Sequence, residues 1–107
     1  MKQGDVWWVN LPGHENRQPV LVVQRNAFNE SRLETAVCVL LTPHWDLAQA
    51  PGNTIITTAD SGLPRAAVAN VAHLLTLSKS QFSEYISTVS PLILETVLDG
   101  IQFILGR

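Results

Sequence analysis

The sequence predicts a mainly β chain with a C-terminal helix, folded as a small, strongly curved antiparallel barrel. Short runs of β-branched and aromatic residues follow one another with brief turn-forming connections, and the one strongly helical pattern comes last. The chain has 107 residues, of which 46% are hydrophobic and 15% charged. We therefore expect a single domain over residues 1–107 that buries enough apolar surface to fold without crosslinks.

Residues 5–11 and 19–24 form the first predicted pair of strands. The second has four consecutive aliphatic residues, Val20 to Val23, without alternation, which is typical of a strand buried on both faces. Pro19 is tolerated there as the first residue of the strand. The connection at 12–16 is rich in turn-forming residues, so we expect an antiparallel hairpin.

The middle of the chain alternates between strands and polar connections. Residues 25–34 are expected to form a loop or one helical turn before a fully apolar strand at 35–42. Residues 43–53 form the longest irregular segment, because proline, glycine and polar residues dominate it. A short strand at 54–58 and a turn at 60–62 follow.

The last third begins with a long β-type run at 66–77. We expect one helical turn at 80–85, an edge strand at 86–89 and a helix over 91–105. Ser90 is in position to cap that helix, and apolar residues recur along it at helical spacing. The helix is expected to cover the open side of the sheet.

Charge and cysteine content exclude several classes of protein. The formal net charge is −2, so any nucleic-acid partner must be held by a local cluster of cations. The single cysteine, Cys38, excludes an internal disulfide and is expected to be a buried, inert thiol. The apolar stretch at 91–105 is too short to cross a bilayer, and the N-terminus lacks the apolar core of a signal peptide, so we expect a cytoplasmic protein.

Motifs for metal binding and for common hydrolases are absent. The histidines His14, His44 and His73 are far apart in sequence and have no cysteine partners, which predicts no metal site. The chain has no glycine-rich phosphate loop and no nucleophile elbow, so nucleotide hydrolysis and serine-hydrolase chemistry have no support.

Polar side chains instead cluster at the ends of predicted core strands. His14, Glu15 and Arg17 precede the second strand, and Thr42 and His44 end the third. If these strands are antiparallel neighbours, Arg17 and Thr42 face each other. The alternative is that the arginine is a solvated charge and the threonine an ordinary strand residue. Residue types alone give a candidate site and leave the function open.

The order of several segments resembles the MazF/PemK family of bacterial toxin endoribonucleases. The segments are GDVWWVNLP, RQPVLVVQRN, an aliphatic strand that ends in Thr42, then PGN, GLPR, VANV and a terminal amphipathic helix. The likeness spans nearly the whole chain. The PGN and LPR segments are similar to a mycobacterial branch of the family.

The resemblance implies an SH3-like, PemK-type barrel that is the toxin component of a type II toxin–antitoxin system. It implies a homodimer that inhibits growth by cutting single-stranded RNA, often messenger RNA, at short sequences, without a metal or other cofactor. The ribose 2′-hydroxyl attacks the adjacent phosphorus. A cognate antitoxin protein wraps the dimer.

The resemblance also implies roles for particular residues. The family's essential threonine matches Thr42, but its essential arginine immediately precedes the strand proline, where this chain has Gln18; Arg17 stands one residue earlier. Glu15 is a possible counterpart of a loop glutamate in the family, and His14 is an independent candidate base. Residues with polar or aromatic side chains suited to RNA bases are Gln18, Gln24, Arg25, Asn26, His44 and Trp45.

Two further functions remain open at this point. Because Gln18 cannot supply positive charge, the chain could be a catalytically weak or silent dimer that binds RNA or antitoxin. A toxin of related fold that targets DNA gyrase is the other alternative. That branch depends on a C-terminal tryptophan, whereas this chain ends in Arg107.

Overall fold

The computed structural model describes residues 1–107 and contains one antiparallel sheet of six strands in the order β4-β5-β3-β2-β1-β6. The strands are β1 (Asp5–Val9), β2 (Gln18–Val22), β3 (Thr35–Thr42), β4 (Thr54–Ile56), β5 (Ala67–Ser78) and β6 (Phe82–Thr88). The helices are α1 (Asn26–Asn29), α2 (Thr58–Ser61) and α3 (Pro91–Ile104), with 3-10 turns η1 (Trp45–Gln49) and η2 (Lys79–Gln81).

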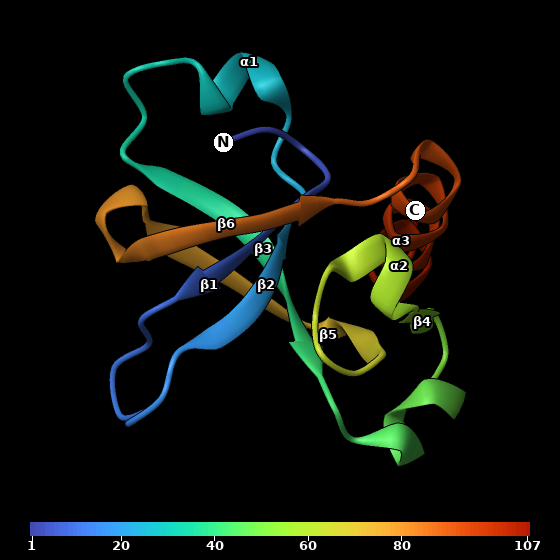
Figure 1. The fold of residues 1–107 in the computed structure, drawn as a ribbon. Helices are drawn as coiled ribbons and strands as arrows, with labels where there is room; N and C mark the ends of the chain where they lie inside the picture. The colour runs from blue at the N-terminus through green and yellow to red at the C-terminus, as the bar shows by residue number, and fades with distance from the viewer.

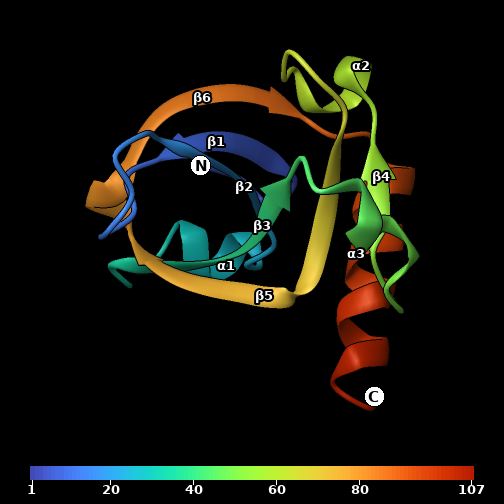
Figure 2. The same cartoon turned by 90° about the horizontal axis from the view of Figure 1, so that it is seen from below.

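The sheet curls strongly, as Figures 1 and 2 show. Viewed along the opening in Figure 2, β6, β1, β2, β3 and β5 follow one another around a ring, and α3 stands beside β4 at one side. The curled antiparallel sheet followed by a C-terminal helix confirms the fold expected from the sequence.

Both faces of β2 are buried, which confirms the interpretation of its unalternated aliphatic run. Leu21, and Val23 directly after the strand, belong to the larger apolar cluster, against which α3 packs, whereas Val20 and Val22 belong to a second cluster on the other side of the strand. Cys38 lies in this second cluster, and burial raises the pKa of its thiol to about 12. A rigid strand therefore leads to the polar residues at its ends.

The expected helix at the C-terminus is confirmed. The Ser90 side chain accepts a hydrogen bond from the backbone N–H of Ile93, and Pro91 opens α3. The carboxylate of Asp60 accepts hydrogen bonds from the Ser90 N–H and hydroxyl, which ties α2 to the start of α3.

The helical turn expected at 80–85 was wrong, whereas the edge strand expected at 86–89 is confirmed as the last part of β6, which lies at the edge of the sheet. Only the short turn η2 is helical, and a single strand, β6, runs through both ranges and pairs with β1. Tertiary packing decides this, because Phe82 and Tyr85 lie edge-on to Trp7 with ring centroids 5.8 and 5.9 Å away.

Two smaller expectations also need correction. The strand predicted at 54–58 ends at Ile56, and α2 replaces its last residue and most of the turn predicted at 60–62. The Thr57 side chain accepts from the Asp60 N–H and so starts the helix, and Gly62, at φ 72°, ends it. The segment expected to be irregular, 43–53, includes the turn η1.

No helix has both the length and the apolar character required to cross a membrane.

Candidate functional site

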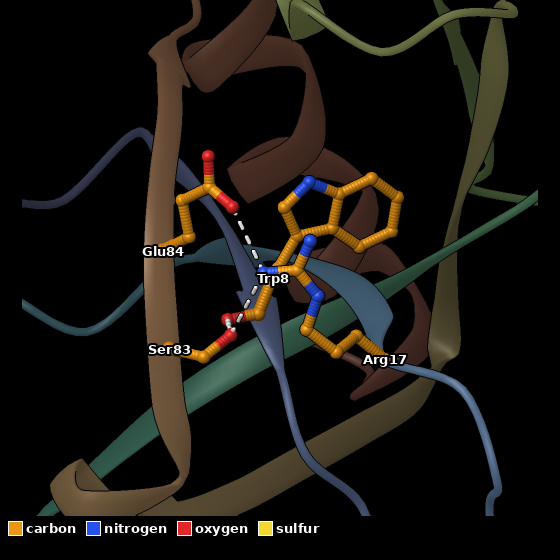
Figure 3. Close-up of polar contacts among 4 residues, drawn as sticks. All are labelled: Trp8, Arg17, Ser83 and Glu84. Carbon is orange, nitrogen blue, oxygen red and sulfur yellow. Dashed lines mark hydrogen bonds and ion pairs between the residues drawn. The ribbon is translucent and has the colours of Figure 1, made fainter.

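Arg17 lies just before β2, and its side chain extends across β1 to β6. Its Nη1 donates hydrogen bonds to Oε1 of Glu84 at 2.9 Å and to Oγ of Ser83 at 3.4 Å. The guanidinium carbon is 5.3 Å from the centroid of the Trp8 ring, as a cation–π contact requires. Figure 3 shows these four side chains together.

The Arg17–Glu84 pair is open to solvent. The side chains are 44% and 60% exposed, respectively. An exposed ion pair of this kind contributes about 0–1 kcal/mol to stability. An anionic ligand can therefore replace Glu84 as the partner of Arg17 at little cost, while Trp8 continues to support the guanidinium group.

A pocket of about 370 Å³ adjoins this cluster. It lies between the strand ends of β1, β2 and β3 and the segment that precedes β5. Its walls are mostly apolar, and Trp8 belongs to both the pocket and the Arg17 cluster. The lining residues are Trp8, Gln18, Pro19, Leu41, Pro43, Leu63, Pro64, Arg65, Ala66 and Ala67.

Thr42 ends β3 and lies on the other side of β2 from Arg17's partners. In the antiparallel register of β2 and β3, Val20 pairs with Leu40. Two residues further along, this register places Gln18, and not Arg17, across from Thr42. Arg17 instead extends over β1, away from β3, so the expected facing of Arg17 and Thr42 is not observed. The physical reason is that adjacent residues of an extended chain point to opposite sides.

The hydroxyl of Thr42 retains a hydrogen to donate. Thr42 is only 5% exposed, and its Oγ1 accepts a hydrogen bond from the His44 N–H at 3.3 Å. His44 and Trp45 follow on the surface, and Trp45 is 54% exposed at the start of η1. An exposed indole beside a strand end can stack on an unpaired base.

The two candidate bases, His14 and Glu15, lie in the loop between β1 and β2 and are exposed. Their side chains make no hydrogen bond and no ion pair. The loop that carries them leads directly to Arg17, so the structure brings them to the same end of the sheet as Arg17 and Gln18.

Gln24 and Asn26 lie at the opposite end of β2, where their polar groups are used inside the protein. The buried Gln24 side chain donates to Oδ1 of Asn29 and to the Thr35 carbonyl, and accepts from the Val37 N–H. Oδ1 of Asn26 accepts from the Gln3 N–H and from Asn29. Arg25, between them, is exposed and unpaired.

The comparison with protein families identifies the chain. A profile described as the PemK-like, MazF-like toxin of type II toxin–antitoxin systems matches residues 2–105. The chain belongs to this family. The resemblance expected from the sequence is thereby confirmed.

Individual relatives agree with this assignment. The chain is 30% identical over 110 residues to Endoribonuclease MazF2 of Mycobacterium bovis and to Endoribonuclease MazF6 of Mycobacterium tuberculosis, with 98% of this chain and 96% of each relative covered. Among solved structures, an endoribonuclease from a mycobacterial species has a TM-score of 0.82 at 24% identity, covering 99% of this chain and 91% of that one. MazF of Deinococcus radiodurans has a TM-score of 0.79 at 18% identity, covering 100% and 97%.

Sequence reasoning missed three residues of the site: Trp8, Ser83 and Glu84. Trp8 was visible as an aromatic residue in a strand, but its use as a support for Arg17 depends on the neighbouring strands. Ser83 and Glu84 fell in a stretch expected to be helical, so no local signal pointed to them. The structure contains no group of three histidine, cysteine, aspartate or glutamate side chains placed to hold a metal ion.

Proposed function

We propose that this chain, acting as a single domain over residues 1–107, is a toxin that cleaves single-stranded RNA without a metal. Its family supports the toxin assignment and its curated relatives are named endoribonucleases. The observation that carries the proposal is the exposed Arg17 guanidinium held over Trp8 beside a pocket, with His14 and Glu15 in the adjoining loop. A cation next to a candidate base is the minimum that phosphodiester cleavage needs.

The proposed reaction is an internal transesterification of RNA. The 2′-oxygen forms a bond to the adjacent phosphorus, and the bond from phosphorus to the 5′-oxygen of the next nucleotide breaks. Glu15 or His14 accepts the proton from the 2′-hydroxyl, and the departing 5′-oxygen takes up a proton from water. The products are a 2′,3′-cyclic phosphate and a 5′-hydroxyl end.

Arg17 and Thr42 are proposed to stabilise the charge on the phosphoryl oxygens. Arg17 exchanges Glu84 for the phosphate, because the exposed ion pair is weak. The Thr42 hydroxyl, which accepts from the His44 N–H, donates its own hydrogen to a phosphoryl oxygen. Gln18 lies between them as a neutral contact, and His44 and Trp45 contact bases of the bound strand.

The partners proposed for this chain follow its relatives. A mycobacterial endoribonuclease has been solved with its cognate antitoxin, and the Deinococcus radiodurans protein as a MazE–MazF complex. We propose a homodimer that a cognate antitoxin inhibits, that recognises a short RNA sequence and that acts in the cytoplasm, where messenger RNA is available.

The test is cleavage of a long single-stranded RNA by the purified protein in EDTA, followed by mapping of both fragment ends. Defined cuts that leave a 2′,3′-cyclic phosphate are expected. Arg17→Ala and Thr42→Ala should remain folded and lose cleavage. Arg32→Ala is the matched control for the first, because Arg32 is exposed and unpaired in the loop before β3. Unchanged cleavage in both site variants would refute the proposed roles.

A second candidate function is supported by Gln18, which places a neutral amide across from Thr42. In that case the protein is a silent dimer that binds RNA or antitoxin. A folded dimer that binds RNA and leaves it intact at high protein concentration would favour this function over cleavage.

A further inference from the structure

The pocket beside Trp8 has walls that are largely rigid. Pro19, Pro43 and Pro64 all line it, and each proline fixes its own backbone φ. Gly62, at the start of the segment that carries Pro64, has φ 72°, and a Cβ there would come within 2.9 Å of Ile86. The segment is therefore held close to β6. The pocket is formed before any ligand binds, which lowers the entropic cost of binding.

The rim of the pocket is positively charged, although the whole chain is not. Arg17 lies over Trp8 at one edge, and Arg65 is an exposed lining residue that forms no ion pair. Glu84 is the one carboxylate paired with either arginine. Two guanidinium groups against one carboxylate give a local positive charge in a protein of formal charge −2.

The combination of apolar walls and a cationic rim restricts the ligand. The walls suit a flat group with apolar faces, and the rim suits anions on either side of that group. A nucleotide within a single strand has both features, because its base has two stacking faces and its neighbouring phosphates carry charge. The volume of about 370 Å³ is within the range of small-ligand pockets.

We propose that this pocket receives one unpaired base of the RNA substrate, and that Arg17 and Arg65 bind the phosphates on either side of that nucleotide. The proposal rests on the proposed function and adds a specificity site to it. Trp8 then has two roles, since it supports the arginine and forms part of the base-binding wall. An apolar side chain of a protein partner would also contact the apolar walls of the pocket, but it would supply no negative charge to pair with the two arginines.

The test uses an RNA oligonucleotide that spans one mapped cleavage site, together with versions in which single bases are removed and the phosphates kept. Loss of the base that enters the pocket should reduce kcat/KM of the wild-type protein about 10- to 100-fold, as expected for one stacked base. Ala66→Leu fills the half-buried lining position and should reduce that penalty to within about threefold.

Ala72→Leu is the matched control, because Ala72 is exposed on β5 outside the pocket. It should retain the wild-type pattern of penalties. A second measurement does not require the Ala66→Leu variant to fold. A plot of log affinity against log salt concentration has a negative slope. Arg65→Gln should make this slope less steep by about 0.7, the value for one phosphate of a single strand, whereas Arg32→Gln should leave it unchanged.

The outcomes separate this inference from the proposed function. If the wild-type protein cuts RNA but Ala66→Leu shows the same penalties, the base pocket is refuted and the proposed cleavage stands. If Ala66→Leu weakens only inhibition by an antitoxin, the pocket binds a protein partner and the inference is also refuted. If the wild-type protein neither binds nor cuts RNA, the proposed function itself fails.

Discussion

At one end of β2, the amide side chain of Gln24 is buried and makes hydrogen bonds to Asn29, Thr35 and Val37. At the other end, Arg17 is exposed and has a partner, Glu84, that is more exposed still. The strand between them is rigid and buried on both faces. The polar side chains at the two ends of β2 therefore have different environments.

A polar residue is available to a ligand only where the protein itself does not already satisfy its hydrogen bonds. The Gln24 end is closed by α1, by the N-terminal segment through Gln3, and by Lys79, whose Nζ donates to the Asn29 carbonyl. The side-chain amides of Gln24, Asn26 and Asn29 there all have partners inside the protein. The Arg17 end is left open beside a pocket, so its polar groups can exchange partners. We expect substitutions at the closed end to change stability and those at the open end to change activity.

The largest effect is expected from Arg17→Ala. Removing the cation should lower RNA cleavage by about 10²- to 10⁴-fold, because charge on the phosphoryl oxygens is no longer stabilised. The melting temperature should change little, since only an exposed ion pair is lost. Cleavage assays and thermal unfolding of the same preparation provide the measurement. A variant that unfolds easily would show that the open end is structural after all.

Gln24→Ala should have the next largest effect, and it should be on stability. The substitution removes the Gln24 side chain as the partner of Asn29 Oδ1, of the Thr35 carbonyl and of the Val37 N–H in a largely buried site. We expect a loss of about 2–4 kcal/mol in the free energy of unfolding, measured by urea denaturation.

Gln18→Ala is the control for that prediction, because it makes the same chemical change at the open end of β2. The Gln18 amide has a single long hydrogen bond, 3.3 Å, to the Asn16 carbonyl. Gln18→Ala should lower the free energy of unfolding by less than about 0.5 kcal/mol. Equal losses in the two variants would contradict the contrast between the two ends.

Gln18→Arg tests the open end of β2 by adding a positive charge there instead of removing one. It places a guanidinium group across from Thr42, at the position before the strand proline. We expect cleavage to increase about tenfold, because positive charge then lies where the neutral amide was. The measurement is the initial rate on a fixed RNA substrate. Unchanged rates would indicate that Arg17 already supplies all the positive charge that the reaction uses.

Glu84→Gln is expected to have the smallest effect. It removes the carboxylate that competes with RNA phosphate for Arg17 while keeping the side chain's shape. RNA affinity should rise about two- to fivefold at low salt, with a stability change within about 1 kcal/mol. Titration of a labelled oligonucleotide measures the affinity. Weaker binding would show that Glu84 is needed to hold Arg17 in place.

Part of the candidate site could be predicted from the sequence. The polar residues before β2 and Thr42 at the end of β3 were recognisable, because a buried strand and its polar end are local patterns. Where Arg17 points could not be predicted. Its partner Glu84 is 67 residues away in the chain, and the contact depends on β6 pairing with β1.

The buried strands, the C-terminal helix with its Ser90 cap and membership of the toxin family could all be predicted from the order of residues along the chain. These depend on hydrophobic periodicity, capping residues and the order of motifs, all of which are readable within short windows. The strand character of residues 82–85, and the end of β2 that stays open, follow from tertiary structure alone. Both depend on packing between distant segments, such as Phe82 and Tyr85 around Trp7, and such packing overrides local preference.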